Sequence, residues 1–429
     1  MIQKFKDRLK NLVQGGFFHI LFGNTLTKMI AFISSIVIVR LVSKEQYAYL
    51  AYADNLYSYI NLVAGLGTST AILKYCSAAK TKEEDKAYFW FTLKYGGAFQ
   101  VAISVILLLY VYIAPIPFPQ ARPLILMMVL YPLLNHIFTT IMNYVRAHLN
   151  NKLYINMSII QTVVVFFGSV GLVLLLDING IVIARYLATF LAVLYSVKFI
   201  KGLGKNVDRI KLNNQQIKGF MAMSVSLMIA SFFSVILVNN EQMLVNYLIA
   251  DEVATANYKV ANLIPAQLTF VTSSIVVYYF PLIARLEDKI QIWKQLKKIG
   301  ILSAGISLAI SVSGMILSPI IIQIAYGNKY EDALSLFPIF WIIHAINSGI
   351  RFLPMNMLAA IGKTKFNAIM SVCTCIVHLI VDYISIKAFG IMGVGIASGL
   401  VYAVSGVLYW LYLYKACKKD NTEGRLFKE

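Results

Sequence analysis

The stretch "YINMSIIQTVVVFFGSVGLVLLL", residues 154 to 176, contains no charged side chain and is apolar over nearly its whole length. About 20 such residues are what a helix needs to cross the hydrocarbon core of a bilayer. A long unbroken run favours a helix over the short alternating strands of a barrel, because the helix satisfies its own backbone hydrogen bonds. The stretch therefore predicts a transmembrane helix.

The rest of the chain repeats this pattern. Of its 429 residues, 59% are hydrophobic and 13% are charged, whereas soluble domains are about 45–50% apolar. We therefore predict an all-α integral membrane protein with twelve transmembrane helices and no soluble domain. The predicted spans cover residues 17–41, 47–73, 87–113, 123–146, 154–176, 181–200, 220–249, 253–283, 299–325, 334–361, 367–388 and 391–414.

The net charge of +19 could indicate a nucleic-acid partner, but its distribution is that of a membrane protein. If the amino terminus is cytoplasmic, 28 of the 38 Lys and Arg residues fall in cytoplasmic segments and five fall in outer loops. Cytoplasmic loops of membrane proteins carry such an excess of positive charge. We therefore predict that both termini are cytoplasmic, and we expect no nucleic-acid partner.

A basic loop at the midpoint separates two halves of six predicted spans each. The halves resemble each other, because "INGIVIA" at 178–184 parallels "IMGVGIA" at 391–397, and Lys152 parallels Lys365 at the same shift in numbering. Copies with an even number of spans cross the membrane in the same direction, and a binding site between the lobes is then expected. The predicted segments are an amphipathic cytoplasmic amino terminus (1–16), a first lobe (17–200), a cytoplasmic linker (201–219), a second lobe (220–415) and a cytoplasmic tail (416–429).

Charged side chains within the predicted spans are the candidate functional residues. Each would cost about 2.5–3.5 kcal/mol if it faced lipid at the bilayer centre, so they cannot all do so. The cations are Lys28, Lys94, Arg185, Lys259 and Arg351, and the acids are Asp54, Glu241 and Asp382.

Depth within the spans sorts the cations. Lys94 and Arg185 lie near the ends of their spans, and we expect their side chains to reach the lipid headgroups. Lys28, Lys259 and Arg351 lie deeper and either line a water-filled cavity, which we favour, or pair with the acids. Lysine binds phosphate as a point charge and arginine as a fork, so a cavity lined by these three residues suits a phosphate-bearing headgroup.

Other polar residues in the spans have two interpretations. His378 and Asp382 share one helix face, and they form either a proton relay or a structural pair. With Asp54 and Glu241 they are the candidates for ion coupling. A further polar group supplies either hydrogen bonds between helices or contacts to sugar hydroxyls. Its members are Asn239, Asn240, Asn257, Asn262 and Gln267.

Neither a metal site nor a cofactor site is predicted. The four cysteines have no metal-ligand spacing, and no phosphate-binding GxxxxGK[ST] loop occurs. No catalytic residues are expected, so we predict a transporter and not an enzyme.

Four stretches carry a resemblance to a known family: "IVIVRLVSKEQYAYLAYADNLYSYINLVAGLGTSTAILKY", "EQMLVNYLIADEVATANYKVANLI", "LSPIIIQIAYGNKYEDALSLFPIF" and "LAAIGKTKFNAIMSVCTCIVHLIVDYISIKAFGIMGVGIASG". They resemble the polysaccharide flippases, which include the O-antigen and capsule flippases, of the multidrug/oligosaccharidyl-lipid/polysaccharide (MOP) exporter superfamily. The resemblance covers nearly the whole chain. One departure is Ala48, where the family usually has glycine.

The resemblance implies two six-helix lobes around a central cavity in the cytoplasmic membrane of a bacterium. It also implies alternating access that moves an undecaprenyl-diphosphate-linked oligosaccharide to the outer leaflet for surface polysaccharide synthesis. Related flippases hold the diphosphate with basic residues in spans one and eight, and Lys28 and Lys259 match by span. The implied partners are this substrate, membrane lipids and a polysaccharide polymerase.

Two alternatives stay open at this point. A cation-coupled multidrug exporter of the same fold would have a net acidic cavity, whereas the charges in these spans lean toward cationic. A membrane-embedded polysaccharide polymerase would carry a large outer loop with catalytic residues, and the predicted outer loops are short.

Overall fold

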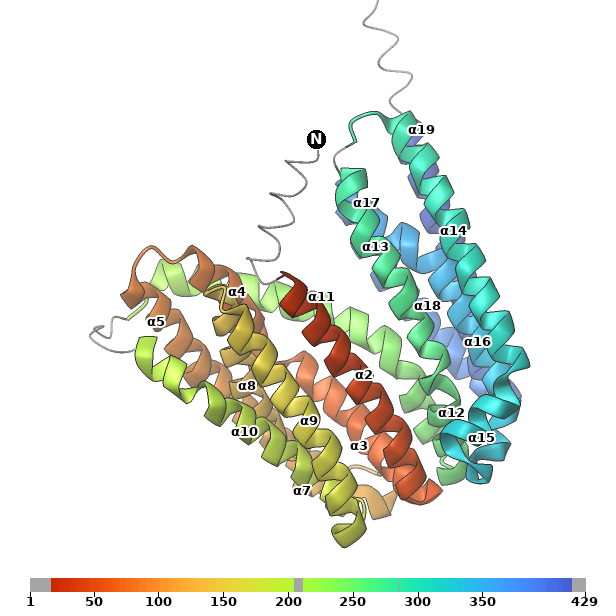
Figure 1. Ribbon diagram of the computed structural model, residues 1–429, viewed down its shortest axis with the longest axis horizontal. Helices are drawn as coiled ribbons and strands as arrows, with labels where there is room; N and C mark the ends of the chain where they lie inside the picture. Colours follow the sequence, from red (N-terminus) through yellow and green to blue (C-terminus); the bar gives the residue numbers. More distant parts are fainter. Residues whose placement is uncertain (1–16, 204–210, 285, 419–429) are drawn as a thin grey trace, which may run out of the picture. The chain divides into compact units, whose positions relative to one another are not determined.

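The structure is a computed structural model that describes residues 17–203, 211–284 and 286–418. Every secondary-structure element in this part of the chain is a helix (Figure 1). The predicted amphipathic segment 1–16 lies outside the described residues, as do residues 419–429 of the predicted tail.

The described helices include many that suit a membrane. Seven are long and apolar enough to cross one, and the number rises to ten if each of three bent helix pairs forms one span. The chain is therefore a multi-pass helical membrane protein. Helical segments lie over all twelve predicted windows, while the number of crossings stays a prediction.

The chain divides into two compact units, one up to Val235 and one from Ile236 onward. The division falls inside a single long helix and not in the predicted linker, residues 201–219. The lobe boundaries at residues 200 and 220 stay a prediction, and each unit is described by itself.

In the first unit, α9 packs against both α2 and α10, and α4 packs against α8 (Figure 1). An apolar core of this unit contains the buried rings of Tyr88, Phe89, Phe138 and Phe220. The helices of this unit, in chain order, are α2 (Phe17–Leu41), α3 (Lys44–Leu62), η1 (Ala64–Gly67), α4 (Thr68–Ala78), α5 (Lys82–Phe91), η2 (Thr92–Gly96), α6 (Gly97–Ile113), η3 (Pro119–Ala121), α7 (Arg122–Met127), α8 (Tyr131–Ala147), α9 (Asn151–Leu176), α10 (Asn179–Leu203) and the first part of α11 (Asn214–Leu248).

In the second unit, α18 packs against α19, and α19 also contacts α14 and α16. Its apolar core includes Leu296, Leu353, Met357 and Tyr409. After the second part of α11, the helices are α12 (Glu252–Leu263), η4 (Pro265–Gln267), α13 (Leu268–Ala284), α14 (Lys289–Ile316), α15 (Ser318–Tyr326), η5 (Asn328–Ser335), α16 (Phe337–Ile346), η6 (Asn347–Phe352), α17 (Leu353–Ala360), α18 (Thr364–Phe389) and α19 (Met392–Lys418).

Polar side chains define where several helices begin. Ser43 and Gln46 exchange side-chain and backbone hydrogen bonds in a capping box at the start of α3. Asn150, Asp251 and Asp288 accept backbone N–H groups at the starts of α9, α12 and α14. These caps accept hydrogen bonds from backbone N–H groups that have no partner within the first helical turn. The helices therefore begin next to these polar residues.

The helical hairpins α9–α10 and α18–α19 are structural copies of each other. One constant shift in numbering carries both ends of α9 (151 and 176) onto those of α18 (364 and 389), and the start of α10 (179) onto that of α19 (392). Asp177 and Gly390, which the same shift relates, connect the helices with φ values of 50° and 60°. The sequence repeat is therefore a repeat in structure.

A glycine lets the two helices of each hairpin approach closely. A Cβ added to Gly393 would lie 2.1 Å from the carbonyl oxygen of Ser385, and one added to Gly180 would lie 2.4 Å from the Leu172 backbone. We expect Gly393→Ala to push α19 away from α18 and to lower the free energy of unfolding by about 1–3 kcal/mol, as overpacking does.

The matched control is Gly399→Ala on the same helix, where an added Cβ would have no atom within 4 Å. It carries the same gain in helix propensity. Thermal unfolding in detergent should give a lower melting temperature for Gly393→Ala than for Gly399→Ala. Equal melting temperatures would contradict the close approach.

Two spans contain a π-helical turn, η2 in the first unit and η6 in the second. Such turns have more residues per turn than an α-helix and are frequent at functional sites. η2 carries Lys94 and η6 carries Arg351, two of the cations predicted within the membrane. Irregular backbone and intramembrane charge therefore coincide at both places.

Candidate functional site

A buried polar cluster joins four helices of the second unit. Asp382 is fully buried, while His378 is 1% exposed and Glu241 is 7% exposed. The sequence predicted these three residues as ion-coupling candidates, and the structure brings them together. The cluster consists of Asn240 and Glu241 from α11, Tyr258 from α12, His378 and Asp382 from α18, and Ser398 from α19.

Glu241 is the centre of this cluster. The Tyr258 hydroxyl donates a hydrogen bond of 2.8 Å to one Glu241 oxygen, and the Ser398 hydroxyl donates to the other. The Nε2 atom of His378 lies 3.3 Å from Glu241 Oε1 and 3.5 Å from Asp382 Oδ1. Asn240 Nδ2 donates to Asp382 Oδ2 over 3.2 Å.

The cluster has the donor atoms that a cation site needs. One ligand atom each from Glu241, His378 and Asp382 lies within 4.8 Å of the others. Asp382 Oδ1 and His378 Nδ1 have no hydrogen-bond partner among the described residues. Two carboxylates this close repel each other in a low-dielectric interior, so a shared proton or a bound cation would stabilise them. Carboxylate and hydroxyl oxygens suit hard cations.

Arg351 lies near this cluster, and the ring of Tyr402 lies between its guanidinium and His378. Its guanidinium stands over the Tyr402 ring at 5.1 Å, and that ring is 5.4 Å from the imidazole of His378. Arg351 is buried and donates to Asn347 Oδ1 over 3.1 Å. Among the described residues it forms no ion pair with an acid, and its predicted role in lining a cavity stays a prediction.

Asp54 forms an ion pair within the first unit. Arg185 from α10 binds it with both terminal nitrogens, and Nη2 donates to Oδ2 over 2.9 Å. The prediction that Arg185 reaches the headgroups stays a prediction. Its position near a span end did not reveal this acidic partner, which lies 131 residues away on α3.

The repeat makes the two acids directly comparable. Arg185 and Ser398 occupy equivalent positions of the two hairpins, and each contacts an acid, Asp54 in the first unit and Glu241 in the second. In the first unit a fixed cation neutralises the acid, whereas in the second unit the equivalent residue is a neutral hydroxyl. Glu241 therefore lacks the permanent counter-charge that Asp54 has at this position.

The residues equivalent to His378 and Asp382 show the same difference. The first hairpin has Val165 and Ser169 at the corresponding positions. Because the first hairpin folds with these neutral residues, the hairpin itself does not require His378 and Asp382. A charged cluster that the fold does not require points to function.

Lys28 and Lys259 lie outside this cluster. Lys28 is exposed on α2 in the first unit, and Lys259 is half-buried on α12 in the second. Lys259 directly follows Tyr258 on α12. Because successive residues of a helix point in different directions, Lys259 lies on a different helix face from Tyr258. Their predicted contact with a phosphate stays a prediction.

The predicted polar lining residues separate by their partners. Asn240 and Asn262 each form a hydrogen bond between helices. Asn240 donates to Asp382, and Asn262 accepts from His344 Nε2 over 2.7 Å. Gln267, at the end of η4, is exposed and donates to the carbonyl of Leu263, the last residue of α12. The remaining two are Asn239, which is half-buried, and Asn257, whose buried Oδ1 atom has no partner among the described residues.

Sequence reasoning missed Tyr258, Ser398 and Tyr402. Serine and tyrosine are ordinary residues of transmembrane helices, so neither stands out in an apolar run. Ser398 could have been found by aligning the two repeats, since it stands at the position of Arg185.

Comparison with known sequences identifies the family. The sequence model of the family described as "Polysaccharide biosynthesis protein" matches residues 12–287. The chain belongs to this family. A relative described as "Putative O-antigen transporter" in Shigella flexneri is 19% identical over 247 residues. The match covers 57% of each chain, little more than half the length of that relative.

Solved structures show the fold of this member of the polysaccharide biosynthesis family. An inward-facing multidrug resistance MATE family transporter of the MOP superfamily matches with a TM-score of 0.71 at 13% identity, over 92% of this chain and 96% of that one. The lipid II flippase MurJ matches with a TM-score of 0.71 at 16% identity, over 93% and 87%. The family model confirms the predicted link to polysaccharide biosynthesis, and the two solved structures show that the chain shares its fold with a MATE family transporter of the MOP superfamily and with a lipid II flippase.

Proposed function

We propose that this protein is a flippase that moves a polyprenyl-diphosphate-linked oligosaccharide across the cytoplasmic membrane of a bacterium. The proposal includes twelve spans in two six-helix lobes, cytoplasmic termini, and alternating access through a cationic cavity. The observation that carries it is the family match over residues 12–287. The relative described as an O-antigen transporter and the fold shared with a lipid II flippase support it.

In this proposal Lys28, Lys259 and Arg351 meet the diphosphate. A positive side chain at bilayer depth is costly unless a negative group accompanies it, and a diphosphate offers several charged oxygens. The oligosaccharide would travel in the polar cavity while the polyprenyl chain stays in lipid. Membrane lipids and a downstream polysaccharide polymerase are the proposed partners, and the protein itself catalyses no covalent step.

The buried cluster around Glu241 would couple transport to an ion. Binding of a proton or a cation neutralises the repulsion between Glu241 and Asp382, so the occupied and empty cluster favour different packing of α11, α18 and α19. A ligand shifts such an equilibrium only through its different affinity for the two states. The neutral residues at the equivalent positions of the first hairpin support a role for the cluster beyond folding.

A cation-coupled multidrug exporter is the second candidate. The acid pair Glu241 and Asp382 favours it, as does the equal likeness in fold to a MATE family transporter. The family match favours the flippase. Expression in a drug-sensitive strain and in a flippase-null strain separates the two, since drug resistance without surface polysaccharide would support the exporter.

Lys28→Ala and Lys259→Ala test the proposed diphosphate contact. Each charge-assisted hydrogen bond contributes about 1.5–3 kcal/mol, so we expect each variant to lose roughly tenfold or more in surface polysaccharide when expressed in a flippase-null strain. Lipid-linked oligosaccharide should accumulate in the inner leaflet. The Lys→Arg variants should keep part of the activity because the charge remains.

Lys294→Ala is the matched control, since Lys294 is an exposed lysine on α14 outside the candidate set. Membrane abundance of all variants is compared by immunoblot. Complete rescue by both Lys28→Ala and Lys259→Ala would remove these residues from the substrate site.

A further inference from the structure

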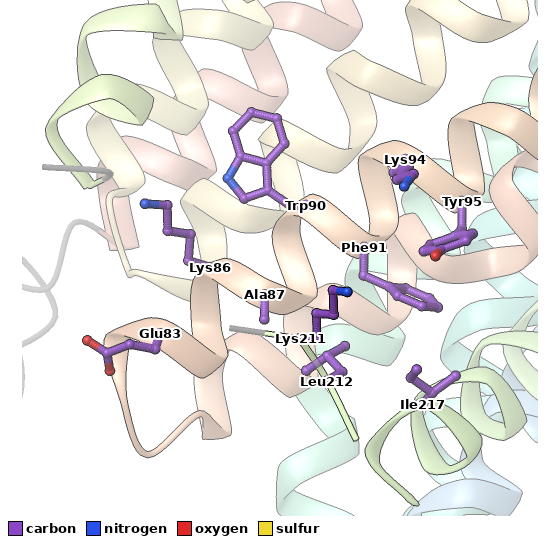
Figure 2. A pocket seen from close by; sticks show the side chains of 10 residues that line it. All are labelled: Glu83, Lys86, Ala87, Trp90, Phe91, Lys94, Tyr95, Lys211, Leu212 and Ile217. Atoms are coloured by element: carbon purple, nitrogen blue, oxygen red, sulfur yellow. The ribbon is translucent and has the colours of Figure 1, made fainter. Parts of the chain in front are cut away.

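A basic cavity in the first unit belongs to neither the buried cluster nor the proposed diphosphate site. It has a volume of about 490 Å³ and lies between α5 with its π-helical continuation η2 and the start of α11 (Figure 2). Among the residues that the structure describes, three lysines line it, Lys86, Lys94 and Lys211, against one acid, Glu83. The cavity therefore carries a positive charge that suits an anionic ligand.

The lysines reach the same cavity because of their spacing. Lys86, Trp90 and Lys94 follow one another at intervals of four residues, as do Ala87, Phe91 and Tyr95. Residues four apart lie on one face of a helix, one turn above the other. The π-helical turn η2 has more residues per turn than an α-helix, which keeps residues 94 and 95 on the face of residues 86 and 90.

The cavity has charged and apolar surfaces. Figure 2 shows Glu83 and Lys86 at one end, and Phe91, Tyr95 and Ile217 at the other with Lys94 beside Tyr95, while Lys211 lies between the two ends. The rings of Phe91 and Tyr95 lie 4.6 Å apart, and Lys94 Nζ stands 5.4 Å from the centre of the Tyr95 ring. A ligand with a charged head and an apolar body matches this arrangement.

The aromatic residues of the cavity fit the same ligand. The helix Lys82–Ile113 is long and apolar enough to cross a membrane, and in the predicted span 87–113 Trp90 and Tyr95 lie about 5 Å and about 12 Å along the axis from its start. The side chains of Trp90 and Tyr95 are 45% and 55% exposed. Exposed Trp and Tyr at this level are typical of the boundary between headgroups and acyl chains.

We propose that this cavity binds one anionic phospholipid of the leaflet at which the Lys82 span begins, the cytoplasmic leaflet in the proposed topology. Lys86 and Lys211 would hold the phosphate, and Lys94 would reach it from within the span. An acyl chain would lie along Phe91, Tyr95 and Ile217. The lipid would thereby connect α5 to the start of α11, the helix that carries Glu241 further along.

The chemistry favours a phospholipid over a soluble phosphate. A soluble anion would gain binding free energy from the lysines alone. A phospholipid would also bury the apolar end of the cavity with its acyl chain. The lipid-linked substrate has the same phosphate and chain chemistry, so the experiment includes a polyprenyl diphosphate as a competitor.

The test uses the full-length protein in nanodiscs that contain phosphatidylglycerol, with phosphatidylethanolamine as the neutral background. Native mass spectrometry counts the lipids that stay bound after release from the disc. We expect the wild-type protein to retain one phosphatidylglycerol, and we expect Lys86→Gln/Lys94→Gln/Lys211→Gln to bind it at least about tenfold more weakly. Trp90→Ala should weaken binding less.

The matched control is Lys294→Gln/Lys297→Gln/Lys298→Gln, which removes three exposed lysines of α14 that do not line this cavity. Size-exclusion chromatography checks that both triple variants are folded, and the single variant Lys94→Gln provides the comparison if the cavity triple variant is not. Retention of phosphatidylglycerol by the folded cavity variant, or its equal loss in the control, would overturn the site. Displacement of phosphatidylglycerol by equimolar polyprenyl diphosphate would overturn the assignment to a phospholipid.

Discussion

Glu241→Gln is expected to stop ion-driven transport while leaving the protein folded. Glutamine keeps the shape of Glu241, and its oxygen can still accept from one of the two hydroxyls while its NH2 group donates to the other, but it can no longer bind a proton or offer a charge to a cation. One elementary charge moved through 100 mV supplies about 2.3 kcal/mol, so the loss of one coupled charge should lower transport by roughly fiftyfold. Asp382→Asn should have a similar effect.

The measurement is uptake of fluorescent lipid-linked oligosaccharide into proteoliposomes, under an imposed proton or sodium gradient. Thermal unfolding serves as the check on folding, and neither variant should lower the melting temperature, because each removes a buried charge. Glu331→Gln, an exposed acid on η5, is the matched control. Undiminished gradient-driven uptake by both Glu241→Gln and Asp382→Asn would exclude coupling through the cluster.

Arg185→Gln is expected to destabilise the first unit through Asp54. Removing one partner of a buried ion pair leaves the other charge without compensation, which costs about 3–5 kcal/mol. The side chains of Arg185 and Asp54 are 20% and 35% exposed, so we expect a cost near the low end, about 3 kcal/mol. Asp54→Asn should cost about as much, because Arg185 would then be the unpaired charge.

The double variant Arg185→Gln/Asp54→Asn distinguishes this effect from a loss of packing. It removes both charges at once, so it should be more stable than either single variant. Melting temperatures in one detergent provide the comparison, with Arg122→Gln, an exposed arginine of α7, as the control. Additive losses in the double variant would show that the two charges do not interact.

The helices could be predicted from the sequence because lipid imposes a simple pattern on it. Runs such as residues 154–176 are long and apolar, and the structure has a helix over each predicted window. The bends could not be predicted. Gly65 and Leu66 adopt positive φ between α3 and α4, a local choice that depends on neighbouring helices and that leaves the hydropathy unchanged.

The candidate site was predictable only where its residues share one helix. His378 and Asp382 are four apart on α18, so their contact followed from helical spacing. Glu241 joins them from α11, far away in the sequence, and the ion pair of Asp54 with Arg185 spans a similar separation. Such contacts follow from tertiary packing, which periodicity in a single sequence does not contain.

The matching hairpins also bear on the history of the protein. Hairpins with matching helix boundaries, the same positive-φ connection and the same close glycine are what the duplication of an ancestral half-length gene would leave. After duplication, the two copies could diverge in charge, with Arg185 in the first hairpin and His378 and Asp382 in the second. Each hairpin would then serve as an internal reference for reverting the charges of the other.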